Sequence, residues 1–322
     1  MERIAEFSQE RSSEEFKALI NRVEGLLIEE QEAGKGKLGR NIKETVSGPY
    51  GNVYFVEEGI AYLPPKGRAV FVGDTHGDSE STQAILKQIN FGERVKEDPD
   101  FWLVFLGDYA DRGTADVKNL LLVLSLKQKY PRNVILLRGN HEHHYVYPRS
   151  LPRSLRKAYG IIGGKRLDSR CLSLFRKMPN VLVCGNEIVA VHGGVPSEDI
   201  ENLFDLKGNE RLFDQIRWND PVEGDFDRIS GKRGSPKYIQ FGLKAFDKFM
   251  EAIGGSVMVR AHEYLGGDWA FMLNDRLLSI FSTGKGSQET GYPWFSTPIF
   301  AEFDLTKPIT QISQENVHPI HY

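Results

Sequence analysis

Short apolar runs divide the chain into predicted strands. The clearest runs hold three to six consecutive apolar residues and are bounded by glycine or polar residues. Runs of this length are typical of strands that are buried on both faces. They cover residues 69–72, 101–106, 134–137, 188–191 and 257–259, with further strands expected at 277–281 and 299–303 and a hairpin formed by 53–56 and 60–63.

Apolar residues at helical spacing predict the helices. Phe16, Leu19, Ile20, Val23 and Leu27 recur with helical periodicity. Ser12 and Glu15 supply the capping-box pattern at the start of this segment. Residues 1–33 are therefore expected to be helical and residues 34–50 to form a flexible Gly/Lys-rich linker, with further helices at 81–90, 115–130 and 244–253.

The order of these elements predicts the fold class. Strands alternate with helices up to about residue 130, which favours parallel pairing in that half. From residue 181 onward the predicted strands follow one another more directly. The expected architecture is an α/β fold in which a mixed β-sandwich is flanked by helices.

Six segments rich in aspartate, histidine and glycine carry the candidate chemistry, and most directly follow a predicted strand. Open α/β sheets bind ligands at the carboxyl ends of their strands. We therefore expect side chains from several segments to meet at one edge. The segments are 73–77, 107–113, 139–142, 192–194, 233–234 and 260–262.

The donor types in these segments suit two neighbouring metal ions. Carboxylate, amide and imidazole donors without thiolates favour manganese, with iron or zinc as alternatives, over calcium or a structural zinc. We assign one ion to Asp74, His76 and Asp108, so that Asp108 bridges to the second ion. The second ion is assigned to Asp108, Asn140, His192 and His262.

The same segments, in the same order, resemble the phosphoprotein phosphatase family of serine/threonine phosphatases, within the calcineurin-like metallophosphoesterases. The resemblance runs from about residue 68 to residue 283, and Ala110 stands where the family has valine. It implies a dinuclear site on a central β-sandwich. It also implies hydrolysis of phosphoserine and phosphothreonine monoesters by direct attack of a water that bridges the metals.

A phosphate monoester requires further groups around such a site. Arg112 and Arg233 are expected to bind the nonbridging oxygens through forked donors, and Arg233 is preferred over the nearby Arg228. His141 is expected to protonate the leaving alkoxide, and Asp111 to hold it charged.

One departure from the family pattern bears on substrate choice. Residues 282–287 replace the Ser-Ala-Pro-Asn-Tyr segment, so the family's tyrosine has no counterpart, and Tyr264 or Lys285 is left as a candidate replacement. The alternative functions are a phosphatase of broader specificity that includes phosphotyrosine, or a dinucleoside polyphosphate hydrolase of the same superfamily. A noncatalytic scaffold that binds phosphoprotein is a third reading.

Three other patterns have weaker functional readings. Residues 34–39 fit G-x-G-x-x-G, but a helix precedes them instead of the strand that nucleotide binding requires. His143 and His144 are expected in a loop near the mouth of the site. The basic stretch 145–165 is either a solvated face or a surface that draws acidic phosphopeptides toward the site.

Composition limits the remaining classes. The 322 residues include 41 basic and 44 acidic side chains, a net charge of −3, so no basic field favours nucleic acid. Membrane insertion and secretion are not expected, because there is no long apolar run and no signal-peptide pattern. We expect a cytoplasmic enzyme with an N-terminal extension over 1–50 and a catalytic domain over 51–322, acting on phosphoproteins; the motifs do not indicate a regulatory subunit.

Overall fold

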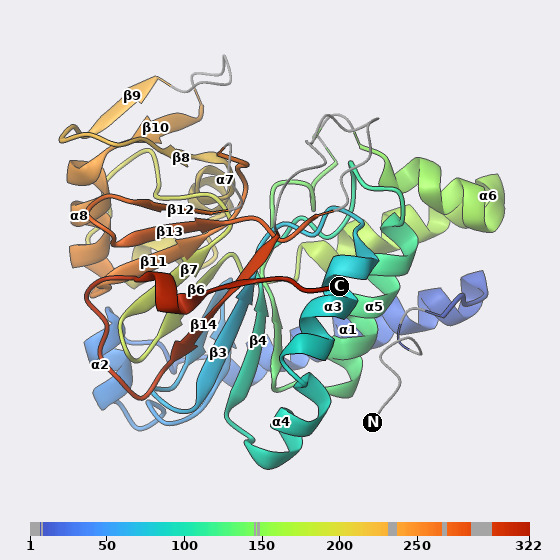
Figure 1. Cartoon of the computed structure of the whole chain (residues 1–322), viewed down its shortest axis with the longest axis horizontal. Coiled ribbons are helices and arrows are strands. Elements are labelled where there is room, and N and C mark those ends of the chain that lie inside the picture. Colours follow the sequence, from blue (N-terminus) through green and yellow to red (C-terminus); the bar gives the residue numbers. More distant parts are fainter. Residues whose placement is uncertain are drawn as a thin grey trace.

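Two β-sheets packed face to face form the centre of the molecule, with helices on both outer sides (Figure 1). The computed structural model describes residues 7, 9–144, 146, 149–230, 237–265, 269–284 and 298–322. Within these residues the larger sheet has seven strands. In spatial order they are β1 (Phe55–Glu57), β2 (Ile60–Leu63), β6 (Val181–Cys184), β7 (Ile188–Val191), β11 (Val257–Arg260), β13 (Leu277–Ile280) and β12 (Trp269–Met272).

The second sheet has five strands in the described part of the chain. They are, in order, β15 (Val317–Pro319), β14 (Ile299–Asp304), β3 (Arg68–Val72), β4 (Phe101–Phe105) and β5 (Val134–Leu136). β3, β4 and β5 are parallel, as the strand and helix alternation predicts. A small third sheet contains β8 (Asp220–Pro221), β10 (Ile239–Phe241) and β9 (Arg228–Ser230).

Strand β4 shows why apolar and polar residues do not alternate in the predicted strands. Trp102 and Val104 belong to the apolar cluster between the two sheets, whereas Phe101, Leu103 and Phe105 belong to the cluster under the helices. Both faces of the strand are therefore buried, which requires apolar residues at every position.

Helices cover the outer face of each sheet. On the side of the five-stranded sheet lie α1 (Ser13–Gly34), α3 (Ser79–Gln88), α4 (Phe91–Glu97), α5 (Asp116–Lys129) and α6 (Leu151–Phe175) (Figure 1). On the side of the seven-stranded sheet lie α2 (Ile42–Ser47), α7 (Glu210–Trp218) and α8 (Leu243–Ile253). Within the described residues, short 3₁₀ helices also span Leu203–Leu206 and Gln314–Asn316.

The helix α1 begins at the predicted capping box. The Glu15 backbone N–H donates to the Ser12 hydroxyl, and the Ser12 N–H donates to the Glu15 carboxylate. Phe16, Ile20 and Val23 are fully buried, and the helix packs against α5, α6 and β1. The apolar stripe of α1 is thus part of the main core.

The expectation of a flexible linker over 34–50 is wrong for its second half, which forms α2. Ile42 and Thr45 of this helix are buried. In the preceding loop, the backbone N–H groups of Lys37 and Leu38 donate to Glu57 Oε2 at 3.0 and 2.8 Å. This glycine-containing loop therefore binds a carboxylate of the protein itself.

The helix α6 is absent from the sequence-based expectation, which treats residues 145–165 only as a basic stretch. Gly160 has φ 73° and ψ 170°, so the helix is kinked there. Glycine is a poor helix former, and the three glycines at 160, 163 and 164 obscure the helical pattern. The other predicted helices shift by one or two residues at their ends, except that α1 begins at Ser13. None of the described helices combines the length and apolar character needed to cross a bilayer.

Candidate metal centre

The predicted ligands lie at the carboxyl ends of strands from both sheets. β3, β4 and β5 lead into Asp74, Asp108 and Asn140, whereas β7 and β11 lead into His192 and His262. The sheets pack face to face, so these ends meet at one edge of the sandwich. All six candidate ligands, including His76, are at most 7% exposed.

Two of the histidines are fixed in one tautomer by backbone carbonyls. Nδ1 of His76 lies 3.1 Å from the Ala110 carbonyl oxygen, and Nδ1 of His192 lies 2.9 Å from that of Leu106. A carbonyl oxygen can only accept, so each Nδ1 carries a proton and donates it. In the neutral imidazole, Nε2 then offers a lone pair, as in metal-ligating histidines.

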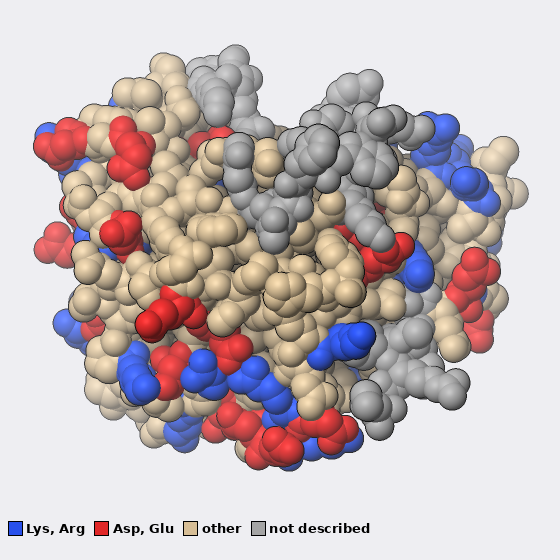
Figure 2. All heavy atoms as spheres, viewed as in Figure 1, with Lys and Arg blue, Asp and Glu red and all other residues tan. Residues whose placement is uncertain are grey.

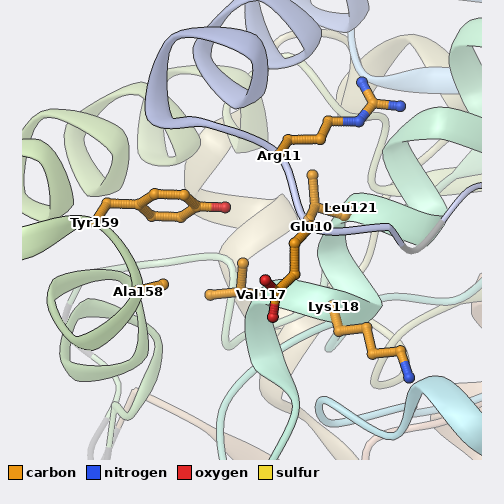
Figure 3. Close-up of a pocket in the computed structure, with 7 residues that line it drawn as sticks. All are labelled: Glu10, Arg11, Val117, Lys118, Leu121, Ala158 and Tyr159. Atoms are coloured by element: carbon orange, nitrogen blue, oxygen red, sulfur yellow. The ribbon is translucent and has the colours of Figure 1, made fainter.

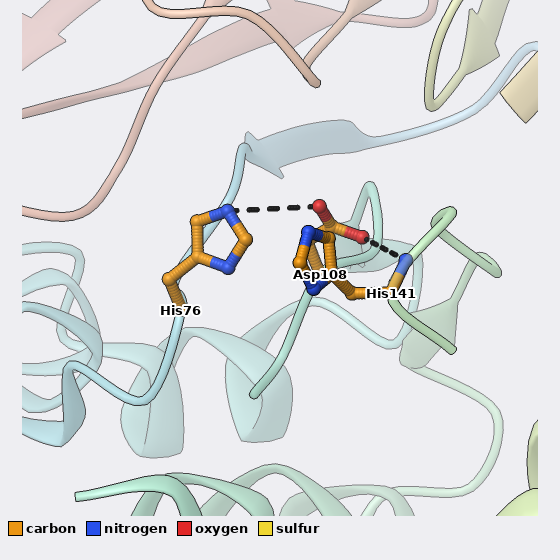
Figure 4. A group of neighbouring side chains, drawn as sticks. All are labelled: His76, Asp108 and His141. Atoms are coloured by element: carbon orange, nitrogen blue, oxygen red, sulfur yellow. Dashed lines mark hydrogen bonds and ion pairs between the residues drawn. The ribbon is translucent and has the colours of Figure 1, made fainter. Parts of the chain in front are cut away.

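Asp108 lies between these two histidines. Its Oδ2 is 3.6 Å from Nε2 of His76, and its Oδ1 is 3.4 Å from Nε2 of His192. The Oδ1 atom also accepts the backbone N–H of His141 at 2.9 Å. Figure 4 shows Asp108 with His76 and His141. The two carboxylate oxygens therefore face different histidines, and this residue could contribute to holding two neighbouring cations.

The other candidate ligands surround this central carboxylate. Asp74 Oδ2 lies 3.4 Å from Nε2 of His76, and Asp74 Oδ1 accepts the backbone N–H of His262 at 3.0 Å. Asn140 Oδ1 lies 3.0 Å from Nε2 of His192. The rings of His192 and His262 contact each other with centroids 5.0 Å apart. The structure thus brings all six side chains into one cluster.

The cluster creates a strongly negative environment for its histidines. Burial lowers the pKa of His76, but Asp74 and Asp108 raise it by more, so that the net shift is upward. The pKa of His192 is raised in the same way, chiefly by Asp108 against the effect of burial. Burial raises the pKa of Asp108, yet the neighbouring histidines hold it well below its ordinary value. Such a site attracts cations, whether protons or metal ions.

These donors fit a pair of divalent cations. Asp74 Oδ2 is buried without a hydrogen-bond partner in the described part of the chain, and lone pairs that face each other repel unless a proton or cation lies between them. Two groups of potential ligands share Asp108: His76, Asp108 and His141, and Asp108, His192 and His262. In each group the ligand atoms lie within 4.8 Å of one another.

Glu142 supports the centre, a role that no sequence pattern predicts. Its Oε2 accepts the backbone N–H groups of Asp108 and Gly139 at 2.8 and 2.9 Å, and its Oε1 accepts that of Tyr109 at 3.1 Å. A Cβ at position 139 would lie 2.6 Å from the Asp108 nitrogen and 2.7 Å from Glu142 Oε2. Only glycine fits there, so these contacts fix two ligand-bearing turns against each other.

Asp220 and Arg260 also hold the site and are also missing from the predicted set. Asp220 Oδ1 lies 3.5 Å from His262 Nε2 and 3.2 Å from the Arg260 guanidinium. The buried Arg260 donates to the Gly193 carbonyl oxygen at 2.6 Å. Arg260 therefore links the turn after β7 to the turn after β11. The sequence signal that could have found Asp220 is the Trp-Asn-Asp-Pro segment at 218–221, which resembles the Trp-Ser-Asp-Pro of the phosphoprotein phosphatase family.

His141 and Asp111 form a buried pair beside the candidate ligands. His141 Nδ1 lies 3.0 Å from Asp111 Oδ2, and Asp111 Oδ1 accepts the backbone N–H of Leu151, the first residue of α6, at 2.7 Å. His141 Nε2 is buried and has no hydrogen-bond partner among the described residues. This arrangement leaves Nε2 as the atom that can exchange a proton with a bound molecule.

Of the two predicted phosphate-binding arginines, only Arg112 lies among the described residues. Arg112 directly follows Asp111 and is half-buried with a φ of 65°. Arg233 lies outside the described residues. The rejected alternative, Arg228, forms ion pairs with Asp199 and Asp227 at 2.8 and 2.6 Å, so carboxylates already occupy its guanidinium.

The segment that departs from the family pattern begins close to the ligands. Ser282 accepts the Gly73 backbone N–H at 2.8 Å, so it holds the turn that carries Asp74. Tyr264 packs against Phe281 with ring centroids 5.8 Å apart, and Phe281 in turn contacts His76. One ring, that of Phe281, therefore lies between Tyr264 and the candidate ligand His76. Lys285 lies outside the described residues.

A cavity of about 440 Å³ opens beside His262. It is lined by His143 and by Trp218, whose ring contacts His262 with centroids 5.7 Å apart. Burial and the charge of Arg138 lower the pKa of His143 to about 4, so this residue is neutral at physiological pH. The ring of His144 stacks on that of His143 at 4.6 Å.

Comparison with known proteins identifies the family. Residues 67–265 match the calcineurin-like phosphoesterase family, and the chain belongs to this family of metal-dependent enzymes. It is 27% identical to a probable serine/threonine-protein phosphatase of Encephalitozoon cuniculi over 80% of this chain and 56% of that protein. It is 29% identical to a serine/threonine-protein phosphatase of Caenorhabditis elegans over 65% of this chain and 46% of that protein.

The chain thus spans about half the length of these curated relatives. Among solved structures, it is similar to a protein serine/threonine phosphatase of Saccharomyces cerevisiae, which is described as similar to human phosphatase PP5. That match has a TM-score of 0.68 at 21% identity and covers 91% of this chain and 83% of the other. The expected fold, a mixed β-sandwich flanked by helices, is confirmed.

Proposed function

We propose that this chain is a metal-dependent protein phosphatase that hydrolyses phosphoserine and phosphothreonine monoesters. The observation that carries the proposal is the position of Asp108, whose two oxygens face the Nε2 atoms of His76 and His192. A carboxylate so placed can hold two cations side by side. The names of the two curated relatives add support for a protein substrate.

The metal ligands of the proposal are those of the predicted set. Asp74, His76 and Asp108 would hold one cation, and Asp108, Asn140, His192 and His262 the other. Manganese is preferred, with iron or zinc as alternatives, because the donors are carboxylate, amide and imidazole. When bound, two such cations lower the pKa of water toward neutrality and stabilise the charge of an in-line displacement.

The remaining residues act on the phosphoryl group and the leaving group. Arg112 and Arg233 would bind the nonbridging oxygens and offset the charge that spreads over them. His141 would donate its Nε2 proton to the departing alkoxide. The contact between its Nδ1 and Asp111 Oδ2 at 3.0 Å supports this role, because it holds the ring in place and leaves the buried Nε2 without a hydrogen-bond partner among the described residues.

The proposal includes a cytoplasmic location. Cys171 and Cys184 are free thiols that are fully buried, and the absence of a disulfide between them agrees with a reducing compartment.

Restoration of activity after chelation tests the proposal. The protein is stripped with a chelator, reloaded with manganese, iron or zinc, and assayed on phosphoserine, phosphothreonine and phosphotyrosine peptides and on diadenosine tetraphosphate. We expect metal-dependent turnover that is fastest on the phosphoserine and phosphothreonine peptides. Faster turnover of phosphotyrosine or of diadenosine tetraphosphate would replace the proposed substrate class, and a metal-loaded protein inactive on all four would contradict catalysis.

A further inference from the structure

The helix α6 exposes two adjacent isoleucines. Ile161 and Ile162 are each 69% exposed, and they follow the kink at Gly160. Scattered single exposed apolar residues are ordinary on soluble proteins, whereas larger contiguous apolar patches mark interaction sites. The pair lies on the helix whose first residue, Leu151, contacts Asp111 of the candidate site.

The same helix carries unpaired positive charge. Arg153, Arg156, Lys157, Lys165 and Arg166 are all exposed, and they have no ion-pair partner among the described residues. The only carboxylate of α6, on Asp168, is bound by Arg149 at 2.7 Å. Figure 2 shows basic side chains gathered over the α6 end of the molecule. This surface is basic although the whole chain has a net charge of −3.

A pocket of about 490 Å³ lies beside this part of α6 (Figure 3). Val117 and Leu121 of α5 and Ala158 and Tyr159 of α6 give it apolar walls. Glu10, Arg11 and Lys118 complete the lining. In Figure 3 the Glu10 carboxylate points toward Val117, whereas the charged ends of Arg11 and Lys118 point away from the pocket, and Arg11 donates to the Ser125 hydroxyl at 3.0 Å. The walls can therefore take an apolar side chain, and acidic neighbours of that side chain would meet the basic residues of α6.

The pocket is close enough to the candidate site for one peptide to reach both. Val117 directly follows Asp116, whose Oδ2 accepts from Ser154 in the first turn of α6. Ala158 lies seven residues beyond Leu151, which is about 10 Å along a helix. An extended chain advances about 3.3–3.6 Å per residue, so these roughly 10 Å correspond to about three residues. The further span from Leu151 to the candidate site raises the expected separation between the phosphoserine and the anchor to roughly four to eight residues.

We propose that Arg153, Arg156, Lys157, Ile161 and Ile162, together with this pocket, form a docking surface for the phosphoprotein substrate. We name it the α6 docking surface. It binds an acidic segment about four to eight residues from the phosphorylated side chain and takes one bulky apolar residue of that segment into the pocket. The proposal rests on the proposed phosphatase function. The concave pocket favours a peptide over a lipid bilayer, which has no side chain to fill it.

Matched phosphopeptides test the docking surface. All of the peptides share one phosphoserine site. Two of them carry four glutamates and a leucine six residues from the phosphoserine, one on its amino side and the other on its carboxyl side. Each has a control peptide in which glutamine replaces the glutamates and alanine replaces the leucine. We expect at least one acidic extension to raise kcat/KM about tenfold at low salt, through a lower KM with kcat unchanged. The advantage should shrink as ionic strength rises, because salt screens exposed charges.

Substitutions on α6 test whether this surface causes the preference for acidic peptides. The double substitutions I161E/I162E and R153E/R156E should each remove the advantage of the acidic extension. The control Ile28→Glu, at an isoleucine of α1 that is 42% exposed, should keep it. Each rate is divided by the rate of the same variant on p-nitrophenyl phosphate, which is too short to reach α6, and thermal unfolding checks that each variant is folded.

The outcomes separate the two proposals. Equal kcat/KM on all peptides with good turnover would overturn the docking surface and leave the phosphatase function standing. A metal-loaded wild-type protein that hydrolyses neither peptides nor p-nitrophenyl phosphate would overturn the function itself. Binding to phosphatidylcholine/phosphatidylserine vesicles that is lost in I161E/I162E, without any peptide preference, would make the surface a membrane contact and overturn peptide docking.

Discussion

At the scale of single residues, the candidate centre depends on backbone groups that set the tautomers of His76 and His192. The carbonyl oxygens of Ala110 and Leu106 accept hydrogen bonds from Nδ1 of His76 and Nδ1 of His192. Each of these hydrogen bonds fixes the orientation of its imidazole ring and therefore the direction in which Nε2 points. Partners of this kind orient metal-ligating histidines and raise their basicity. The chemistry of the centre is therefore built into the turns that follow β3 and β4.

Those turns are held in unusual backbone conformations. Five of the eleven non-glycine residues with positive φ in the described part of the chain are candidate site residues. Such conformations cost free energy and cluster at functional sites, where the surrounding structure enforces them. The five residues are His76, Asp108, Asp111, Arg112 and His262.

The role of His141 predicts a dependence on the leaving group. Replacement with glutamine removes the proton donor, so hydrolysis of an alkyl phosphate should fall by about 10²–10⁴-fold. Hydrolysis of p-nitrophenyl phosphate should fall much less, because nitrophenolate departs with little need for a proton. Steady-state kinetics on both substrates measure the difference. Equal losses on the two would contradict leaving-group protonation by His141.

The close approach at Gly139 predicts that a single methyl group disrupts the centre. In Gly139→Ala the new Cβ would press on Asp108 and Glu142, so we expect loss of bound metal and a fall in kcat/KM of at least about tenfold. Gly25→Ala is the matched control, because no atom lies within 4 Å of its added Cβ. In the middle of α1 that control should stabilise the fold by about 0.5–1 kcal/mol. Metal content at wild-type level in Gly139→Ala would contradict this account.

At the scale of elements, an ion-pair network ties α4 to the five-stranded sheet. Glu302 of β14 contacts Arg68 of β3 at 2.6 Å and Arg94 of α4 at 2.7 Å. Burial raises the pKa of Glu302, but the hydrogen bonds and charges of Arg94 and Arg68 lower it by more. The folded-state pKa thus lies below the unfolded value of about 4.3.

This shift predicts how stability depends on pH. The ionised network stabilises the fold above about pH 4.3, and that contribution is lost as the pH falls through the folded-state pKa. We expect Glu302→Gln to lower the free energy of unfolding at pH 7 and to show a smaller further loss on acidification than the wild type. Urea unfolding at several pH values measures both. If the free energy of unfolding changes with pH in the same way for both proteins, the ion-pair network makes no pH-dependent contribution to stability.

The elements that the sequence predicts best are those buried on both faces. The apolar runs locate β3, β4, β5, β7 and β11 within one residue at each end, because no polar residue is tolerated in the middle of the sandwich. The longer amphipathic helices α1, α3, α5 and α8 are also found, whereas the short helices α4 and α7 are not. The basic, glycine-interrupted α6 and the linker helix α2 are missed too, because their positions are fixed by packing and not by a periodic pattern.

Within the candidate site, the residues that form sequence motifs were predicted, whereas the residues that support them through contacts with other segments were not. All six candidate ligands and the pair of His141 and Asp111 could be named from motifs, and the structure brings them together. Glu142, Asp220 and Arg260 were missed as supports because their partners are backbone N–H or carbonyl groups, or side chains, on other segments. Nothing in a linear sequence shows such contacts.

At the scale of the whole molecule, the candidate centre exists only because two sheets converge. Strands of the five-stranded sheet supply Asp74, Asp108 and Asn140, and strands of the seven-stranded sheet supply His192 and His262. The apolar cluster between the sheets fixes their separation. A change that alters sheet packing should therefore affect metal binding even when no ligand is touched.

The central proposal is that Asp108 would hold two metal ions. Asp108→Asn keeps the shape of the side chain, removes its negative charge and replaces one of its two oxygens by an amide nitrogen that is a poor metal ligand. The decisive measurement is metal content by elemental analysis of this variant and the wild type, with kcat/KM on a phosphoserine peptide. The account predicts two ions per wild-type chain, fewer in the variant, and at least about a 100-fold loss of kcat/KM. A variant that retains two ions and wild-type turnover would contradict it.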